Sequence, residues 1–194
     1  MLQVVLDVET KKTFDEVGGF FPEQLGISFV GVCVRTSNHG SGEMKGYFEE
    51  DLPKLFPLLE EADIVIGYNN DGFDMPTFTN YYDGNISKIP TLDLMARIKK
   101  SCGHRISLDS VAQATFNQKK TGDGLDAIKY YRTGRLKELA EYCLQDVKLT
   151  RELFDYGFNN GNVKFYNKWN RLVECNVDFT YKPRKDFGTQ TSLF

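Results

Sequence analysis

The sequence predicts an α/β domain in which a mixed central β-sheet is flanked by helices. Three observations lead to this prediction. Two β-branched runs near the N-terminus are joined by a loop rich in turn residues, which indicates antiparallel strands. A helical segment and a short buried strand follow, and this order implies a parallel crossover. The longest helical stretch comes late in the chain and carries an apolar stripe along one face.

The N-terminal part of the chain should form the antiparallel group. Residues 2–9 alternate as a half-buried strand does, and residues 10–25 contain two adjacent glycines and a proline, as loops do. A second strand is expected at 26–35, with further loop and strand material through residue 48. These strands would start the sheet.

Helical spacing of apolar residues dominates the rest of the chain. The segments expected there are a helix at 52–61, a strand at 63–67, and helices at 73–82, 90–98, 108–116 and 136–154. The core-facing stripe of the last helix is expected to consist of Leu136, Ala140, Cys143, Val147 and Phe154. Residues 1–180 would then be one domain, and 181–194, which are polar and basic, a flexible C-terminal tail.

Composition excludes several classes of protein. Of the 194 residues 41% are hydrophobic, so the chain can bury a core and is not a disordered polymer. Its 24 Lys and Arg against 27 Asp and Glu give a net charge of -3, so a nucleic-acid partner would have to be bound locally. The apolar runs are too short for a membrane helix and no leader precedes them, which favours a cytoplasmic protein.

The four cysteines, Cys33, Cys102, Cys143 and Cys175, are dozens of residues apart and form no CxxC pair. That spacing disfavours a structural zinc site. We expect reduced thiols that serve mostly as packing residues.

Three groups of acidic residues occur along the chain. Asp7 and Glu9 are two apart on a strand, so both side chains leave the same face. Asp74 follows a strand and a turn, and Asp146 lies four residues after Tyr142 on one face of the long helix. Taken singly each has a structural interpretation, since strand ends are often acidic and Asp74 could cap a helix. Together, four converging carboxylates would repel one another unless divalent cations neutralised them. Oxygen ligands without His or Cys favour Mg²⁺ or Mn²⁺.

At these residues the sequence resembles a known family. The segments around Asp7-Val-Glu9, IVIGYNNDGFDMP and YCLQDVKLT resemble the Exo I, Exo II and Exo III motifs of the DEDD exonucleases, in the tyrosine-bearing (DEDDy) branch. They look most like the 3'-5' proofreading exonuclease domain of family B DNA polymerases. The resemblance covers residues 2–154 and implies a ribonuclease H-like fold.

The resemblance also implies roles for single residues. Asp7, Glu9, Asp74 and Asp146 would hold two divalent metal ions, Mg²⁺ or Mn²⁺, and Tyr142 would orient the attacking water. Two metals about 4 Å apart can activate a water and stabilise the leaving 3' oxygen. The expected reaction releases nucleoside 5'-monophosphates from a 3' end of DNA, single-stranded or frayed.

Several nearby residues are more ambiguous. His104 and Asp109 match the third motif of the histidine-bearing branch, but they come soon after Asp74, so we expect His104 on the surface. Asn69 is a candidate for substrate binding or for a turn, and Phe73 for stacking on a terminal base or for the core. Asp93 is expected to cap a helix.

The last five residues, Gln190-Thr-Ser-Leu-Phe194, resemble the binding motif for the bacterial sliding clamp. In that motif a glutamine occupies one small site and a Leu-Phe pair, here Leu193 and Phe194, fills an apolar pocket. Thr191 departs from it, because leucine is commoner there. The alternative is a tail that folds back on its own domain.

The sequence therefore predicts a metal-dependent 3'-5' exonuclease that acts on DNA and is tethered to the replication clamp. Two alternatives stay open. One is a 3'-5' exoribonuclease of the ribonuclease D type, because the active-site motifs do not separate the two sugars. The other is a non-catalytic module that keeps the fold and recruits partners in DNA replication or repair.

Overall fold

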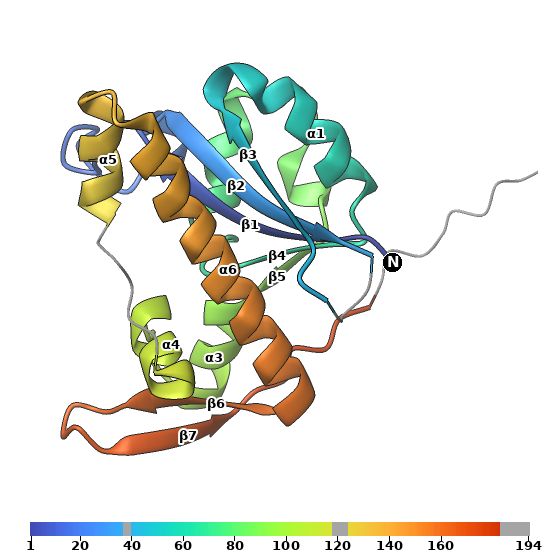
Figure 1. Ribbon diagram of the computed structural model, residues 1–194, viewed down its shortest axis with the longest axis vertical. Helices are drawn as coiled ribbons and strands as arrows, with labels where there is room; N and C mark the ends of the chain where they lie inside the picture. Colours follow the sequence, from blue (N-terminus) through green and yellow to red (C-terminus); the bar gives the residue numbers. More distant parts are fainter. Residues whose placement is uncertain (37–39, 118–123, 183–194) are drawn as a thin grey trace, which may run out of the picture.

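A computed structural model describes residues 1–36, 40–117 and 124–182 (Figure 1). The strands in these residues are β1 (Gln3–Thr10), β2 (Ile27–Arg35), β3 (Glu43–Phe48), β4 (Ile64–Gly67), β5 (Thr91–Asp93), β6 (Asn162–Tyr166) and β7 (Leu172–Asn176). The α-helices are α1 (Leu52–Glu61), α2 (Asp74–Thr77), α3 (Leu94–Cys102), α4 (Leu108–Phe116), α5 (Gly124–Arg132) and α6 (Leu136–Asn160). No helix in this part of the chain has both the length and the apolar character needed to cross a membrane.

The central sheet has five strands in the order β3-β2-β1-β4-β5. β1 pairs antiparallel with β2, and β2 with β3, whereas β1–β4 and β4–β5 are parallel pairs. The N-terminal antiparallel group and the parallel crossover through α1 are therefore confirmed. β6 and β7 form a separate two-stranded hairpin below α3 and α4 in Figure 1.

Each face of the sheet carries its own apolar layer. Val4, Leu6 and Val8 point to the face covered by α1, while Val5 points to the face covered by α3, α4 and α6. This is the period-two alternation expected for β1. The hairpin closes the second layer, because Val163, Phe165 and Cys175 are buried in it.

Helix α6 lies unusually close to β2, because β2 has a glycine at the point of contact. A Cβ atom on Gly31 would come within 3.0 Å of Cys143 Sγ and of Val147 Cγ2. Gly31 pairs with Asp7 in the sheet, so this contact sets α6 directly over Asp7. The path of α6 across the sheet is visible in Figure 1.

The predicted elements differ from the structure in a few places. The helix expected at 90–98 was wrong at its start, because 91–93 pair with β4 and Asp93 caps α3. The helix expected at 73–82 is only the short α2 followed by a 3-10 turn. In the stripe of α6, Leu136 is 42% exposed, because it begins the helix beyond the edge of the core. No element was predicted for α5 or for the β6–β7 hairpin.

The prediction of four reduced cysteines was also wrong. Cys102 at the end of α3 and Cys175 on β7 form a disulfide, with Cα atoms 6.3 Å apart. They are 73 residues apart, and only the packing of the hairpin against α3 brings them together. Cys33 and Cys143 are free and buried, as expected for packing residues.

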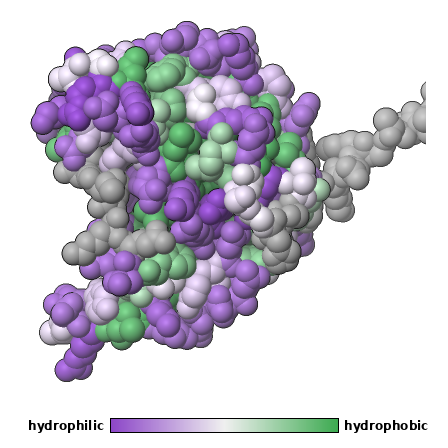
Figure 2. All heavy atoms as spheres, viewed as in Figure 1, coloured by the Kyte–Doolittle hydropathy of each residue, from purple (hydrophilic) through white to green (hydrophobic). Residues whose placement is uncertain are grey.

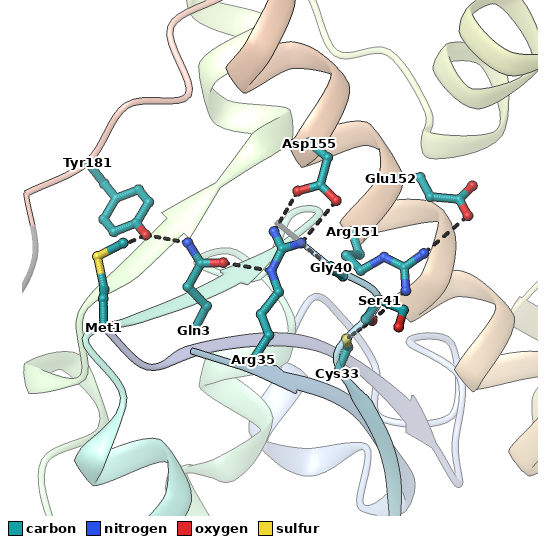
Figure 3. A network of polar contacts seen from close by, with 10 residues as sticks. All are labelled: Met1, Gln3, Cys33, Arg35, Gly40, Ser41, Arg151, Glu152, Asp155 and Tyr181. Atoms are coloured by element: carbon teal, nitrogen blue, oxygen red, sulfur yellow. Dashed lines mark hydrogen bonds and ion pairs between the residues drawn. The ribbon is translucent and has the colours of Figure 1, made fainter. Parts of the chain in front are cut away.

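A buried arginine ties the N-terminal strands to α6 (Figure 3). Arg35 ends β2 and is 5% exposed, and its Nε donates to Gln3 Oε1 on β1 at 2.7 Å. Its two Nη atoms donate to the carboxylate of Asp155 at 2.6 and 3.0 Å. Gln3 in turn donates to the hydroxyl of Tyr181. This network holds together two strands, α6 and the segment after β7.

We expect Asp155→Ala to lower the free energy of unfolding by about 3 kcal/mol, because it leaves the buried guanidinium of Arg35 without its carboxylate. Urea unfolding followed by circular dichroism measures this. The control is Lys54→Ala, which breaks the exposed Lys54–Asp51 pair and should cost no more than about 0.5 kcal/mol. Equal, small losses in the two variants would contradict a structural role for the Arg35 network.

Candidate metal and nucleotide site

The carboxylates of Asp7 and Glu9 converge beside α6. Both leave the same face of β1, and their oxygens, together with Cys143 Sγ, all lie within 4.8 Å of one another. Glu9 is 7% exposed and Asp7 is partly buried. The strand geometry alone therefore produces the acidic pair that the sequence predicts.

Asp74 joins this pair through the backbone of β1. β4 pairs with β1 only over Gln3–Val5, so the later part of β1 has no β4 residue opposite it. The amide N–H of Val8, between the two acidic residues, donates instead to Asp74 Oδ1 at 2.9 Å. Asp74 begins α2 and does not serve as its N-cap, which is Phe73.

Burial and charge both act on Asp74. It is 3% exposed, and loss of hydration together with the charge of Asp7 raises its pKa well above the usual value. The hydrogen bond from Val8 opposes that shift but does not reverse it. A cation between these carboxylates would favour the charged form of Asp74.

Tyr142 and Asp146 come from one face of α6, four residues apart. They are 5% and 4% exposed, and both line the same cavity of about 480 Å³ as Asp7 and Glu9. The structure therefore brings all five predicted residues to one end of the sheet, where the close contact at Gly31 sets α6 against β1.

Cys143 is a member of the site that the sequence analysis assigned only to packing. Its Sγ lies 3.4 Å from Asp7 Oδ2 and 3.4 Å from the carbonyl oxygen of Asp7. Burial, with the charges of Asp7 and Glu9, raises its pKa well above the usual value. The thiol donates to Asp7.

The donor set fits a hard divalent cation. Asp7, Glu9, Asp74 and Asp146 offer carboxylate oxygens, which Mg²⁺ and Mn²⁺ prefer. Zinc sites are instead built mostly from histidine and thiolate ligands.

Part of the remaining wall of the cavity is apolar. Phe14, Phe73, Leu125 and Ile128 line it. Phe14 lies edge-on to Phe73, with ring centroids 5.9 Å apart, and stacks on the exposed Phe20 at 4.5 Å. A flat apolar ligand could therefore rest beside the carboxylates.

The two candidates for substrate binding, Phe73 and Asn69, have different positions. Phe73 is partly buried and lines the cavity, so it is not a core residue. Asn69 is not among the residues that line this cavity. Its backbone adopts a φ of 70°. The backbone carbonyl of Asn69 accepts from Phe73 N at 2.9 Å, and its backbone N–H donates to Asp93 Oδ1 at 3.0 Å. Asn69 thus shapes the turn that carries Asp74.

Other predictions near the site are also confirmed. Asp93 caps α3 by accepting from Ala96 N. His104 is exposed, with its ring edge-on to Phe165, and does not line the acidic cavity.

The three candidate clamp-binding residues, Gln190, Leu193 and Phe194, lie outside the described residues, so their role stays a prediction.

Sequence analysis missed Phe14, Leu125 and Ile128. The three phenylalanines of the loop after β1, Phe14, Phe20 and Phe21, are the signal that could have found the first of them. Leu125 and Ile128 belong to α5, which no pattern had predicted.

A similar solved structure, that of a DNA polymerase, supports the fold. The family B DNA polymerase of the hyperthermophilic archaeon Pyrobaculum calidifontis superposes with a TM-score of 0.61 at 16% identity, over 81% of this chain and 24% of the polymerase. The zinc-bound complex of E. coli ExoI with ssDNA gives a TM-score of 0.49 at 13% identity, over 82% and 41% of the two chains. The chain thus spans about a quarter of the polymerase and two fifths of ExoI.

No match was found among curated proteins. The family comparison is positive, and the model of the RNase_H superfamily matches residues 6–157. That span starts just before Asp7 and ends beyond Asp146, so it contains the acidic site and the five-stranded sheet except for residues 3–5 of β1. With this match over most of its length, the chain belongs to the RNase_H superfamily.

Proposed function

We propose that the protein is a metal-dependent 3'-5' exonuclease that releases nucleoside 5'-monophosphates from single-stranded or frayed 3' ends of DNA. The observation that carries this proposal is the convergence of Asp7 and Glu9 with Asp74, which is hydrogen-bonded to the residue between them. Membership of the RNase_H superfamily and the polymerase-like fold support it.

The acidic residues would hold the cations, with Asp7 and Glu9 from β1, Asp74 from α2 and Asp146 from α6. Bound divalent cations would supply a water nucleophile at neutral pH and offset the charge that develops on the phosphate. Tyr142 lines the same cavity, and its hydroxyl can fix the position of a water by hydrogen bonding. The thiol of Cys143 holds Asp7 in its orientation.

The apolar wall would receive the terminal base. Phe14 and Phe73 offer aromatic surface on the cavity wall shared with the carboxylates, and stacking on aromatic rings does not depend on which base is bound. A nucleotide in this cavity would therefore have its base against the rings and its phosphate toward the acidic residues, as a sequence-independent exonuclease requires.

The proposal predicts that Asp7→Asn lowers Mn²⁺-dependent nucleotide release by at least about a hundredfold, because the cations lose a ligand. The assay follows 5'-labelled single-stranded DNA and RNA oligonucleotides on a gel. Asp83→Asn, which removes an exposed carboxylate outside the cavity, is the matched control and should keep full activity. Stepwise shortening of RNA in preference to DNA would assign the protein to RNA processing. Full activity of Asp7→Asn would contradict the assignment of the site.

Tyr142→Phe should lower the rate by about tenfold, which is less than the loss of a carboxylate, because the water loses one orienting hydrogen bond. Single-turnover rates on the DNA oligonucleotide measure the effect. Tyr47→Phe on β3, outside the cavity, controls for loss of a phenol elsewhere. A loss as large as that of Asp7→Asn would show that Tyr142 does more than orient water.

We also propose that the C-terminal residues Gln190, Leu193 and Phe194 tether the enzyme to a bacterial-type sliding clamp, which would raise its effective concentration on DNA. Deletion of 190–194 should remove binding to the purified clamp in a pull-down while nucleotide release from free oligonucleotides stays unchanged. Retention of the truncated protein on the clamp would disprove the tether.

A further inference from the structure

A second cavity lies between the β6–β7 hairpin and the loop that follows α3. Its volume is about 490 Å³, and its lining includes His104, Arg105, Tyr166, Lys168 and Trp169. It lies outside the acidic site, and the hairpin follows the span matched by the family model. Its described lining residues include none from the five-stranded sheet and none of the carboxylates of the acidic site.

The turn of the hairpin carries a solvent-exposed aromatic side chain, Trp169. Trp169 is 69% exposed, and Tyr166 beside it is 48% exposed. The side chain of Asn167 fixes the turn by accepting from the amides of Trp169 and Arg171 at 3.0 and 3.1 Å. Because the turn is tied by its own hydrogen bonds, the backbone that carries the indole is already ordered, which lowers the conformational entropy lost on binding.

The two walls of the cavity are joined covalently. Cys102 lies two residues before His104, and its disulfide partner Cys175 lies on β7. The distance between Arg105 on one wall and Lys168 on the other is thereby constrained, as a preformed binding surface requires.

The charge of this region is opposite to that of the whole chain. His104, Arg105 and Lys168 line the cavity, and no Asp or Glu is among its described lining residues. Lys168 Nζ lies 4.5 Å from the centre of the Trp169 ring, so a cation accompanies the aromatic surface. Figure 2 shows the turn end of the hairpin standing out at the lower left with mainly hydrophilic colouring. Cations interleaved with exposed aromatic rings fit the phosphates and bases of a single strand.

One side chain connects this cavity to the edge of the sheet that carries the acidic site. Tyr68 directly follows β4, and its hydroxyl donates to the carbonyl of Ile106 at 2.6 Å. Ile106 lines the hairpin cavity. The side chain of Tyr68 therefore spans the distance between the end of β4 and this cavity. Since β1 and β4 are parallel, Asp7 and Glu9 lie at the same edge.

We propose that the hairpin cavity binds single-stranded nucleic acid upstream of the reacting 3' end, with a base stacked on Trp169 and phosphates held by Arg105 and Lys168. The identity of the ligand rests on the proposed function. The site would hold the strand while its end is removed, and would give this acidic protein a local anion-binding surface.

Trp169 is the only tryptophan of the chain, so tryptophan emission, excited selectively over that of tyrosine, reports on this site alone. The full-length Asp7→Asn protein, without divalent metal, is titrated with dU and rU dodecamers, which share one base and differ in the sugar, and with a blunt DNA duplex. We expect saturable quenching by one or both single strands, and a log–log salt slope of about −1.4 for two phosphate contacts. Quenching by one dodecamer names the sugar that the site accepts. Equal quenching by the duplex, or none by any ligand, would overturn the proposal.

Variants test the assignment of residues. Arg105→Ala and Lys168→Ala should each weaken binding and reduce the salt slope by about 0.7. Trp169→Ala, followed by anisotropy of a labelled dodecamer, should weaken binding by roughly five- to a hundredfold. Lys54→Ala on α1, which packs on the other face of the sheet, is the control and should bind normally. Unchanged affinity in all three variants of the cavity, Arg105→Ala, Lys168→Ala and Trp169→Ala, would overturn the proposal.

The inference and the proposed function can fail separately. Degradation of the dodecamer by the unmodified protein without any change in Trp169 emission would overturn the hairpin site and leave the exonuclease intact. Saturable quenching without degradation would support the hairpin site and contradict the exonuclease. Arg105→Ala in the otherwise unmodified enzyme should raise KM for the dodecamer, and an unchanged KM would count against the hairpin site.

Discussion

The hydrogen bond from the Val8 amide to Asp74 is the contact on which the acidic site depends. It exists because β1 extends past the residues that pair with β4, which frees a backbone donor at the end of the sheet. A carboxylate from α2 takes the place of a missing strand residue, and the alternation of β1 puts Asp7 and Glu9 on either side of that donor. The backbone of β1 thus holds the carboxylates of Asp7, Glu9 and Asp74 close together, although their like charges repel one another.

Bringing those charges together has an electrostatic cost that the fold does not itself offset. Asp74 is buried with its pKa raised by lost hydration and by Asp7, and α6 sets Asp146 over the same cavity because Gly31 has no side chain. Among the described residues that line the cavity, Lys12 alone carries a positive charge at neutral pH. Such an arrangement is stable and useful when divalent cations complete it.

The sequence predicted what depends on local periodicity. Strand alternation placed Asp7 with Glu9, and helical spacing placed Tyr142 with Asp146, because both rules act over a few residues. It could not predict what depends on distant contacts. The Cys102–Cys175 disulfide needs a hairpin packed on α3, and the cavity wall from α5 needs a helix whose apolar face is recognisable only once α6 is beside it. The assignment of Leu136 to the core was wrong because the helical period does not indicate where along the helix the core ends.

Anomalous diffraction from crystals soaked in Mn²⁺ tests most directly whether the acidic cluster is a two-cation site. The account predicts two manganese peaks about 4 Å apart, bounded by oxygens of Asp7, Glu9, Asp74 and Asp146, with the Cys143 sulfur outside the coordination shell. Manganese absent from this cluster, or bound there without either Asp74 or Asp146, would contradict the account.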